Sequence, residues 1–208
     1  MIARGACAGP ATPDEQVEGI AARGYAVVAD ALPVPVIEGL RRRAMALDAS
    51  HGLTQAGIGR EGRRMNDAAV RGDSIAWLPD QARDRSERVL FAMLEGLRTR
   101  CNRELQLGLF DIEGHYALYP PGAAYARHLD RFRDLDTRVL SFVLYLNDAW
   151  RPAEGGALRL YVDDANSIEV TPAGGTAVVY LSARFEHEVL PGTRPRWSVT
   201  GWFRRRPV

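Results

Sequence analysis

The sequence predicts an α+β fold that is mainly β, in which helices pack around one β-core. Two observations predict it. Apolar residues recur at helical spacing in the first half of the chain, and short β-rich runs separated by turn residues follow from residue 113 onward. At 208 residues the chain suits one domain, or one domain with an extension. We therefore expect residues 1–112 to form a helical support with one or more strands and a mobile flap. Residues 113–208 should form the β-core, and the two parts should make one structural unit.

Three helices are expected in the first half. The first begins at a capping box of Thr12 and Glu15, with Pro13 at the first helical position, and it ends at Gly24. The run YAVV (25–28) is typical of a short strand. The second helix follows LPVP, and the third runs from about Gln81 to Leu107. The apolar stripes that predict these two helices are Val36, Ile37, Leu40, Ala44 and Leu47, and then Val89, Leu90, Met93, Leu94, Leu97 and Cys101.

The stretch between the second and third helices is rich in glycine and arginine and poor in bulky apolar residues over 49–73. This composition is typical of a loop, and loops of this length are usually functional or disordered. We therefore expect a mobile flap over about 49–76. Its arginines Arg60, Arg63 and Arg64 suit plain solubility and an acidic partner surface about equally.

The second half contains short β-rich runs whose spacing indicates a sandwich or barrel rather than alternating β-α-β units. Alternate residues of a strand share a face, so each run has two distinct faces. In VLSFVLYL (139–146) one face is wholly apolar and should pack on the helices, whereas the other carries Ser141 and Tyr145. In RWSVTGWF (196–203) one face carries Arg196, Ser198, Thr200 and Trp202. Because an unpaired buried charge is very costly, this polar stripe indicates a cavity with a ligand.

The run YARHLDRF (125–132) places His128 and Asp130 two positions apart, which in an extended segment directs both toward one point. His187, late in the β-half, supplies a third candidate ligand. Two histidines and one carboxylate leave adjacent positions open on an octahedral metal, which favours non-haem Fe(II) over closed structural zinc. Arg196 follows His187 across a turn, and its guanidinium can hold a distal carboxylate by two parallel hydrogen bonds.

With these residues in order, the sequence resembles the Fe(II)/2-oxoglutarate-dependent oxygenases, and specifically the prolyl-4-hydroxylase branch. The matching segments are YPPGAAYARHLD, VLYLNDAW, GGALRLY, HEVLP and RWSVTGWF. The upstream VRGDSIAWL (70–78) is similar to a segment of the oxygen-sensing prolyl hydroxylases of animals and their bacterial relatives. The resemblance implies a double-stranded β-helix, or jelly-roll, core.

The resemblance also implies roles for particular residues. It makes His128, Asp130 and His187 the iron ligands and catalytic centre. It pairs Arg196, helped by Tyr145, with the 5-carboxylate of 2-oxoglutarate. The other implied contacts are Tyr119, Thr200 and Trp202 for the cosubstrate, and Tyr125, Arg71 and Asp73 for the substrate. The segment YPP departs from the usual Tyr-Pro-Gly, and RFRDLDTR (131–138) is short and charged. Both departures concern substrate choice and not the metal ligands.

The implied activity is hydroxylation of a prolyl residue of a cytosolic protein. The enzyme would bind Fe(II), consume 2-oxoglutarate and O2 as cosubstrates, and release succinate and CO2. Ascorbate is an optional cofactor. By analogy with bacterial relatives the partner is a translation factor, and a monomer is expected. Three alternatives stay open: an oxygenase of small molecules, an oxygenase of nucleic acids, and a non-catalytic metal-binding module. The nucleic-acid enzymes resemble an R-x-N-x-T-x-R pattern, and this strand lacks the second arginine.

The composition also bears on the partners and the cellular location of the protein. With 27 basic and 26 acidic residues the formal net charge is +1, which favours neither nucleic acid nor an anionic membrane. The two cysteines cannot form a disulfide framework, and no run approaches the roughly 18 apolar residues needed to span a bilayer. A cytoplasmic location is therefore the default. We expect His51 and His115 to be ordinary surface or core residues, and Trp77 and Trp150 to be packing residues.

Overall fold

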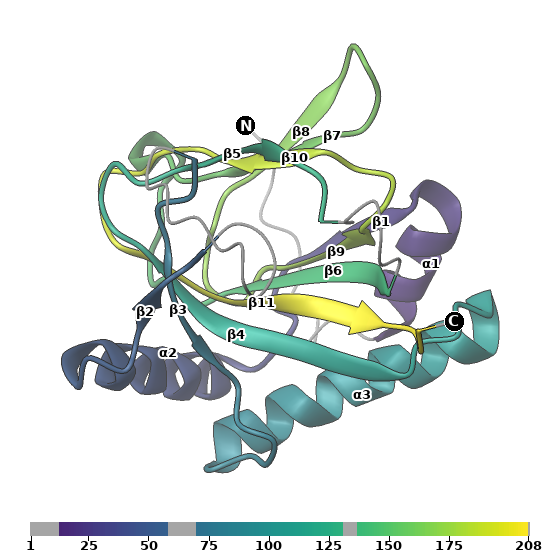
Figure 1. The fold of residues 1–208 in the computed structure, drawn as a ribbon, viewed down its shortest axis with the longest axis horizontal. Coiled ribbons are helices and arrows are strands. Elements are labelled where there is room, and N and C mark those ends of the chain that lie inside the picture. The colour runs from purple at the N-terminus through teal and green to yellow at the C-terminus, as the bar shows by residue number, and fades with distance from the viewer. Residues whose placement is uncertain (1–12, 58–69, 131–136, 208) are drawn as a thin grey trace.

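The computed structural model describes residues 13–57, 70–130 and 137–207, and Figure 1 shows how its elements are arranged. Three α-helices lie in the first half: α1 (Pro13–Arg23), α2 (Val34–Ala49) and α3 (Arg85–Leu105). The 3-10 turn η1 spans Pro152–Glu154. The strands are β1 (Tyr25–Val28), β2 (Thr54–Gln55), β3 (Ser74–Trp77), β4 (Asp111–Tyr119), β5 (Tyr125–His128), β6 (Arg138–Tyr145), β7 (Leu158–Tyr161), β8 (Ser167–Val170), β9 (Ala177–Leu181), β10 (His187–Val189) and β11 (Arg196–Arg204).

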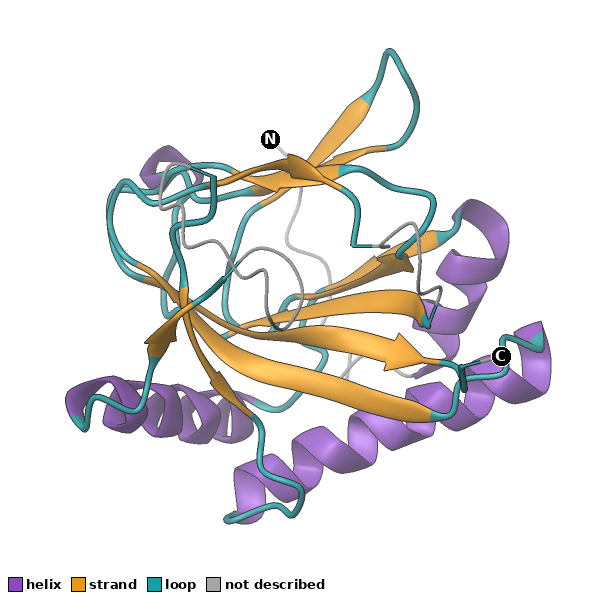
Figure 2. Ribbon diagram, in the orientation of Figure 1, coloured by secondary structure: helices purple, strands orange, loops and turns teal. Residues whose placement is uncertain are grey.

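The strands form two antiparallel sheets. The larger has the order β1-β9-β6-β11-β4-β3-β2, and the smaller has the order β5-β10-β7-β8. Figures 1 and 2 show the smaller sheet above the larger one, with α2 and α3 beneath the larger sheet. The predicted fold, mainly β with packed helices and a double-stranded β-helix core, is confirmed.

The helices and the larger sheet enclose the main hydrophobic core. Leu140, Phe142 and Leu144 of β6 and Val199 and Phe203 of β11 contribute the sheet side of this core. Helix residues at the predicted positions contribute the other side, among them Leu40, Ala44, Leu90, Leu94, Leu97 and Cys101. The alternation predicted for these two strands is therefore confirmed: the apolar face meets the helices, and the opposite face is free to line a site between the sheets.

The third helix is shorter than predicted at both ends. Helix α3 begins at Arg85 rather than at Gln81, because the Asp84 side chain accepts a hydrogen bond from the Glu87 backbone N–H at 2.9 Å and caps the helix. It ends at Leu105 rather than at Leu107, because Gln106 adopts the left-handed conformation with a φ of +54°. Helix α1 ends where predicted, at Gly24, which has a φ of +85°. The capping box predicted at Thr12 lies outside the described residues.

The predicted long loop is shorter than the sequence indicated. Strand β3 pairs with β4, and β2 pairs with β3, so both extend the larger sheet. The backbone of residues 70–72 is also fixed to the smaller sheet, through Ala126 N–H to Val70 O and Gly72 N–H to Ala124 O, each 2.9 Å. Strand β2 has two residues, too few to show any alternation, and β3 (SIAW) lacks the β-branched enrichment by which YAVV of the same length was recognised. The arginines predicted to face a partner, Arg60, Arg63 and Arg64, lie outside the described residues.

Within the described part of the chain, no helix is both long enough and apolar enough to cross a membrane.

Candidate active site

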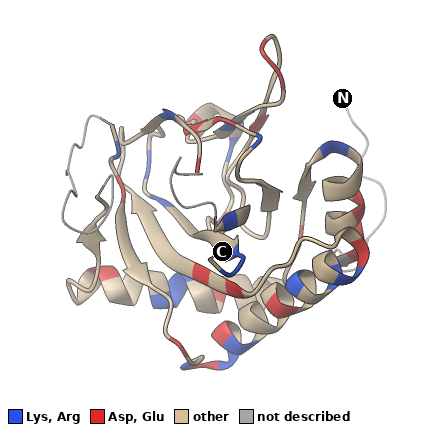
Figure 3. Ribbon diagram, turned by 45° about the vertical axis from the view of Figure 1, so that its right-hand side comes forward, with Lys and Arg blue, Asp and Glu red and all other residues tan. Residues whose placement is uncertain are grey.

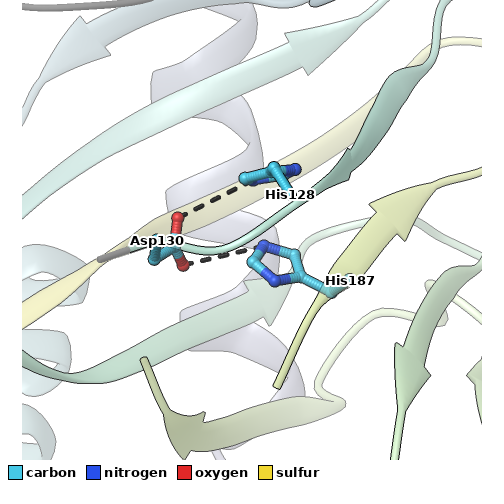
Figure 4. Close-up of side chains that lie close together, drawn as sticks. All are labelled: His128, Asp130 and His187. Carbon is cyan, nitrogen blue, oxygen red and sulfur yellow. Dashed lines mark ion pairs between the residues drawn. The ribbon is translucent and has the colours of Figure 1, made fainter. Parts of the chain in front are cut away.

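The three predicted metal ligands lie together between the two sheets (Figure 4). His128 ends β5, His187 begins β10, and the antiparallel pairing of these strands sets the two residues opposite each other. Asp130 follows two residues after His128. His128 Nε2 is 3.7 Å from Asp130 Oδ1, and His187 Nε2 is 3.6 Å from Asp130 Oδ2. One ligand atom from each residue lies within 4.8 Å of the others, which is a separation that a single metal ion can bridge.

Backbone carbonyls orient both imidazoles. His128 Nδ1 is 2.7 Å from Ala126 O, and His187 Nδ1 is 3.3 Å from Phe185 O. A carbonyl oxygen only accepts, so each Nδ1 carries the hydrogen and donates. Each Nε2 is therefore left with its lone pair directed at the cluster, which is the tautomer a metal ligand requires.

Hydroxyl groups hold the carboxylate. Asp130 Oδ2 accepts from Ser141 Oγ at 2.6 Å and from the Tyr180 hydroxyl at 3.2 Å. The Tyr180 hydroxyl is also 3.0 Å from His187 Nε2, and Ser141 Oγ is 2.8 Å from Ser182 Oγ. The sequence analysis missed Tyr180 and Ser182. Tyr180 lies opposite Ser141 in the β6–β9 register, and no local pattern in the sequence indicates that pairing.

The protonation states of His128 and Asp130 favour binding of a cation. Burial, together with the charge of His187, lowers the pKa of His128 to about 4. Burial alone would raise the pKa of Asp130, but the nearby histidines and the Ser141 hydrogen bond outweigh it and lower the value to about 2. At neutral pH the set therefore offers an unprotonated His128 nitrogen and a carboxylate. Two imidazoles and one carboxylate with room for further ligands fit non-haem Fe(II).

A second predicted group lies at the start of β11. Arg196 is buried, with 3% of its surface exposed, and its Nε has no acceptor. Its Nη2 donates to the Tyr145 hydroxyl at 3.3 Å, and its guanidinium lies 5.0 Å from the Tyr119 ring centre and 4.9 Å from that of Tyr145. Among the described residues no carboxylate pairs with it. A buried, unmatched guanidinium fits the carboxylate of a ligand such as 2-oxoglutarate.

One cavity of about 540 Å³ joins the cluster to Arg196. The polar face predicted for β11 lines it: Arg196, Ser198, Thr200 and Trp202. Tyr119 and Tyr125 line it as well, whereas Tyr145 is not part of the lining and accepts a hydrogen bond from Arg196. The Thr200 hydroxyl donates to Phe142 O at 2.9 Å.

The predicted substrate residues lie at the same cavity. The Tyr125 ring stacks on His128 with centroids 3.7 Å apart, and the Arg71 guanidinium lies 4.9 Å from the Tyr125 ring centre. Arg71 donates two hydrogen bonds to the buried Asp73 carboxylate, at 2.7 and 3.1 Å. This pair fixes the Arg71 side chain against the entrance to the metal cluster.

One expectation about the remaining residues is wrong. Trp77 was expected to be a packing residue, but it is 50% exposed and lines the cavity, where its ring packs edge-on against His115. His115 is a buried core residue, as expected, and it lines the cavity as well. Strand β3 brings Trp77 to this place, and the sequence analysis had not recognised that strand. Trp150 is a packing residue as predicted: it is buried, and its Nε1–H donates to Gly155 O at 2.9 Å.

Comparison with known proteins agrees with this site. Residues 114–204 match the model of the 2OG-Fe(II) oxygenase superfamily. A prolyl-4-hydroxylase from Pseudomonas putida has a solved structure that is 42% identical, with a TM-score of 0.86, covering 94% of this chain and 100% of that one. The chain belongs to the 2OG-Fe(II) oxygenase superfamily. As such an oxygenase, with prolyl hydroxylases among its relatives, it uses Fe(II), 2-oxoglutarate and O2.

Two further relatives of this oxygenase are animal proteins. The prolyl hydroxylase of Trichoplax adhaerens, solved with a fragment of the hypoxia-inducible factor oxygen degradation domain, has a TM-score of 0.84 at 24% identity. The match covers 92% of this chain and 88% of that one, and it bears on the fold alone. The hypoxia-inducible factor prolyl hydroxylase of Caenorhabditis elegans is 30% identical over 146 residues. That match covers 64% of this chain and 20% of the much longer relative.

Proposed function

We propose that this oxygenase hydroxylates a prolyl residue of a cytosolic protein and releases succinate and CO2. One observation carries the proposal: a single cavity joins a His-Asp-His cluster to a buried guanidinium that has no carboxylate partner among the described residues. The first group suits Fe(II), and the second suits the distal carboxylate of 2-oxoglutarate.

The residues have separate tasks in this proposal. His128, Asp130 and His187 hold Fe(II), which when bound supplies the oxidising power for attack on an unactivated C–H bond together with 2-oxoglutarate and O2. Arg196, supported by the Tyr145 hydroxyl, binds and orients the 5-carboxylate. The walls of Tyr119, Thr200 and Trp202 exclude water from the reacting atoms. Tyr125, with Arg71 and Asp73 beside it, forms the substrate entrance.

Exposed apolar residues at the cavity mouth support a polypeptide substrate. Trp77 is 50% exposed and Leu129 is 42% exposed, and both line the cavity. Val70, 37% exposed, lies next to Arg71 and is hydrogen-bonded to β5. Exposed apolar side chains gathered around a pocket are typical of a surface that contacts another macromolecule. The Pseudomonas relative is a prolyl-4-hydroxylase, which favours proline as the target, and a translation factor is the first candidate protein.

A nucleic-acid substrate has less support. Figure 3 shows basic and acidic residues interspersed along α1 and α3, and the formal net charge is +1. Binding of a polyanion depends on many phosphate contacts from a continuous basic surface.

The test is substrate-dependent succinate formation, with mass spectrometry of proteins for an added oxygen on proline. Asp130→Ala should abolish both signals, because the cluster loses its only carboxylate. Asp48→Ala removes an exposed carboxylate from the end of α2 and is the matched control, which should retain both signals. Full turnover in Asp130→Ala would refute the assignment of the metal ligands.

A further inference from the structure

His115 is a buried polar residue without a partner. It lies in the middle of β4, is 1% exposed, and lines the cavity. Neither of its ring nitrogens has a hydrogen-bond partner among the described residues. Buried polar atoms in native proteins are almost always hydrogen-bonded, and each exception needs an explanation. The cavity beside His115 is where a partner from outside the protein would enter.

Two indoles surround the imidazole. The Trp77 ring lies edge-on to it with centroids 5.1 Å apart, and the Trp202 ring is tilted at 5.7 Å. In the sheet, His115 lies directly between Trp77 of β3 and Thr200 of β11. The Thr200 hydroxyl is already engaged with Phe142 O. The Arg138 guanidinium lies 3.4 Å from the Trp202 ring centre and donates to Glu113 at 3.2 Å, and both residues line the same cavity. The subsite therefore combines two indoles and an Arg138–Glu113 ion pair with an imidazole that has no hydrogen-bond partner among the described residues.

The imidazole is uncharged at neutral pH. Burial, reinforced by the charge of Arg71, lowers the pKa of His115 to about 3, although the carboxylates of Asp73 and Asp130 act in the opposite direction. A neutral imidazole offers one N–H donor and one nitrogen acceptor. It suits a neutral group such as an amide better than a carboxylate or phosphate.

The subsite is separate from the position proposed for 2-oxoglutarate. Arg196 lies opposite Tyr119 in the β11–β4 register, and Tyr119 is four residues from His115, or about 13 Å along the strand. His115 is also two strands away from β6, or about 10 Å, and β6 carries the Ser141 hydroxyl that holds Asp130. We therefore assign a ligand group at His115 to the substrate, and Thr200 and Trp202, which the resemblance implied for the cosubstrate, lie at this end of the cavity as well.

We propose that His115 is a specificity-determining residue whose N–H donates to a backbone carbonyl of the substrate polypeptide near the target proline. The inference rests on the proposed function. Proline has no N–H, so at the proline itself the carbonyl, which only accepts, is the backbone group that the enzyme can bind. The exposed indole of Trp77 suits the apolar face of a pyrrolidine ring or of a neighbouring side chain.

The experiment uses the whole protein and a synthetic library of peptides with a central proline flanked by randomised residues. The peptide that the wild type hydroxylates best becomes the probe, and kcat and KM are measured by mass spectrometry. His115→Phe keeps a ring of similar size and loses the donor, so KM should rise about threefold to tenfold and kcat should change less. His115→Gln restores a donor and should recover most of the affinity. His51→Asn, which removes an exposed histidine, is the control.

A second measurement identifies the carbonyl. Probe peptides with an (E)-alkene in place of one amide lack one carbonyl each. One of them should bind the wild type more weakly by the same threefold to tenfold factor, and His115→Phe should not distinguish it from the parent. If His115→Phe has the KM of the wild type and responds to every isostere as the wild type does, the imidazole bonds an ordered water only and the inference is wrong. If the wild type hydroxylates no peptide of the library, the proposed function itself fails.

Discussion

Replacing Arg196 by methionine should remove the binding of 2-oxoglutarate without stabilising the ligand-free protein. The Arg196 side chain is buried, its Nε has no acceptor, and Nη2 makes one long hydrogen bond of 3.3 Å to the Tyr145 hydroxyl. Methionine has a similar length and no charge, so it removes the unmatched Nε, but it leaves the buried Tyr145 hydroxyl without that donor. These two changes oppose each other in the free energy of unfolding, whereas the binding of the ligand loses its guanidinium outright.

The two effects have different magnitudes. Removing an unsatisfied buried polar group gains about 1–3 kcal/mol, and leaving the Tyr145 hydroxyl without its donor costs about the same. Losing the cation–π contacts with Tyr119 and Tyr145 costs about 1–2 kcal/mol more, which corresponds to a Tm lower by about 2–8 °C for a chain of this size. For the ligand, losing a charge-assisted pair of hydrogen bonds costs about 2–4 kcal/mol, which is about 30-fold to 1,000-fold in affinity. Arg196→Lys should recover only part of this, since an ammonium lacks the planar fork.

Thermal unfolding with and without 2-oxoglutarate, with Mn²⁺ in place of Fe(II), measures both effects. The wild type should melt at higher temperature with the cosubstrate, whereas Arg196→Met should melt no higher than the ligand-free wild type and respond little to the cosubstrate. Arg194→Met is the matched control: Arg194 is part-exposed and pairs with Glu154 at 3.1 Å, so this variant should keep the full response. An Arg196→Met protein that binds 2-oxoglutarate as tightly as the wild type would refute the placement of the anion.

Three further predictions concern the hydroxyls that hold Asp130, the burial of His115 and the ion pair of Asp73. Ser141→Ala and Tyr180→Phe should each weaken Co²⁺ binding in calorimetric titration about 10-fold to 100-fold, because Asp130 loses a hydroxyl that holds its second oxygen; unchanged affinity would contradict this role. His115 has a pKa of about 3 in the folded protein and an ordinary value near 6.5 when unfolded, so the unfolded state binds the extra proton between these values and stability falls as the pH drops. In urea unfolding His115 should therefore contribute a loss of about 2 kcal/mol between about pH 8 and pH 5, in addition to the loss from His128, whose pKa is lowered to about 4. His115→Phe should flatten the slope by the contribution of His115, whereas an equal slope would mean that this imidazole is not buried in the neutral form. Asp73→Ala should destabilise the protein by about 3 kcal/mol in the same assay, because the Arg71 guanidinium loses its carboxylate partner. An unchanged midpoint would show that the Arg71–Asp73 pair contributes nothing to stability.

The faces of the central strands could be predicted because they follow a local rule. Along β6, Leu140, Phe142 and Leu144 alternate with Ser141 and Val143, and the structure buries the first set against the helices. The side-chain period of a strand is two, so knowing that one face is apolar determines the other. The metal ligands were predictable for a similar reason, since two of them, His128 and Asp130, lie two residues apart in one extended segment.

The residues that the sequence analysis missed depend on which strands are neighbours. Tyr180 lies in an apolar run and carries no sign of function by itself. It reaches Asp130 because β9 pairs with β6 in a register that sets Tyr180 opposite Ser141. His115 likewise gains its meaning from Trp77 and Trp202, which come from β3 and β11. Strand neighbours far apart along the chain are determined by the whole fold, and a single sequence does not contain that register in any local pattern.

Strand β11 shows how one element sets the geometry of both binding steps. Its inward face carries Arg196 at one end and Trp202 at the other, about 20 Å apart along the strand. Its outward face packs Val199 and Phe203 into the core and so keeps the strand rigid. Gly201 lies opposite Gly114 in β4. A Cβ on Gly201 would come within 2.1 Å of a β4 backbone oxygen, so the close approach of the two strands depends on the absence of a side chain at these positions. That close contact holds His115 against Thr200 and Trp202, which means that the substrate end of the cavity and the cosubstrate end are fixed by the same pair of strands. A change in substrate preference therefore requires new side chains on this scaffold, whereas a change in strand spacing would disturb both ends together.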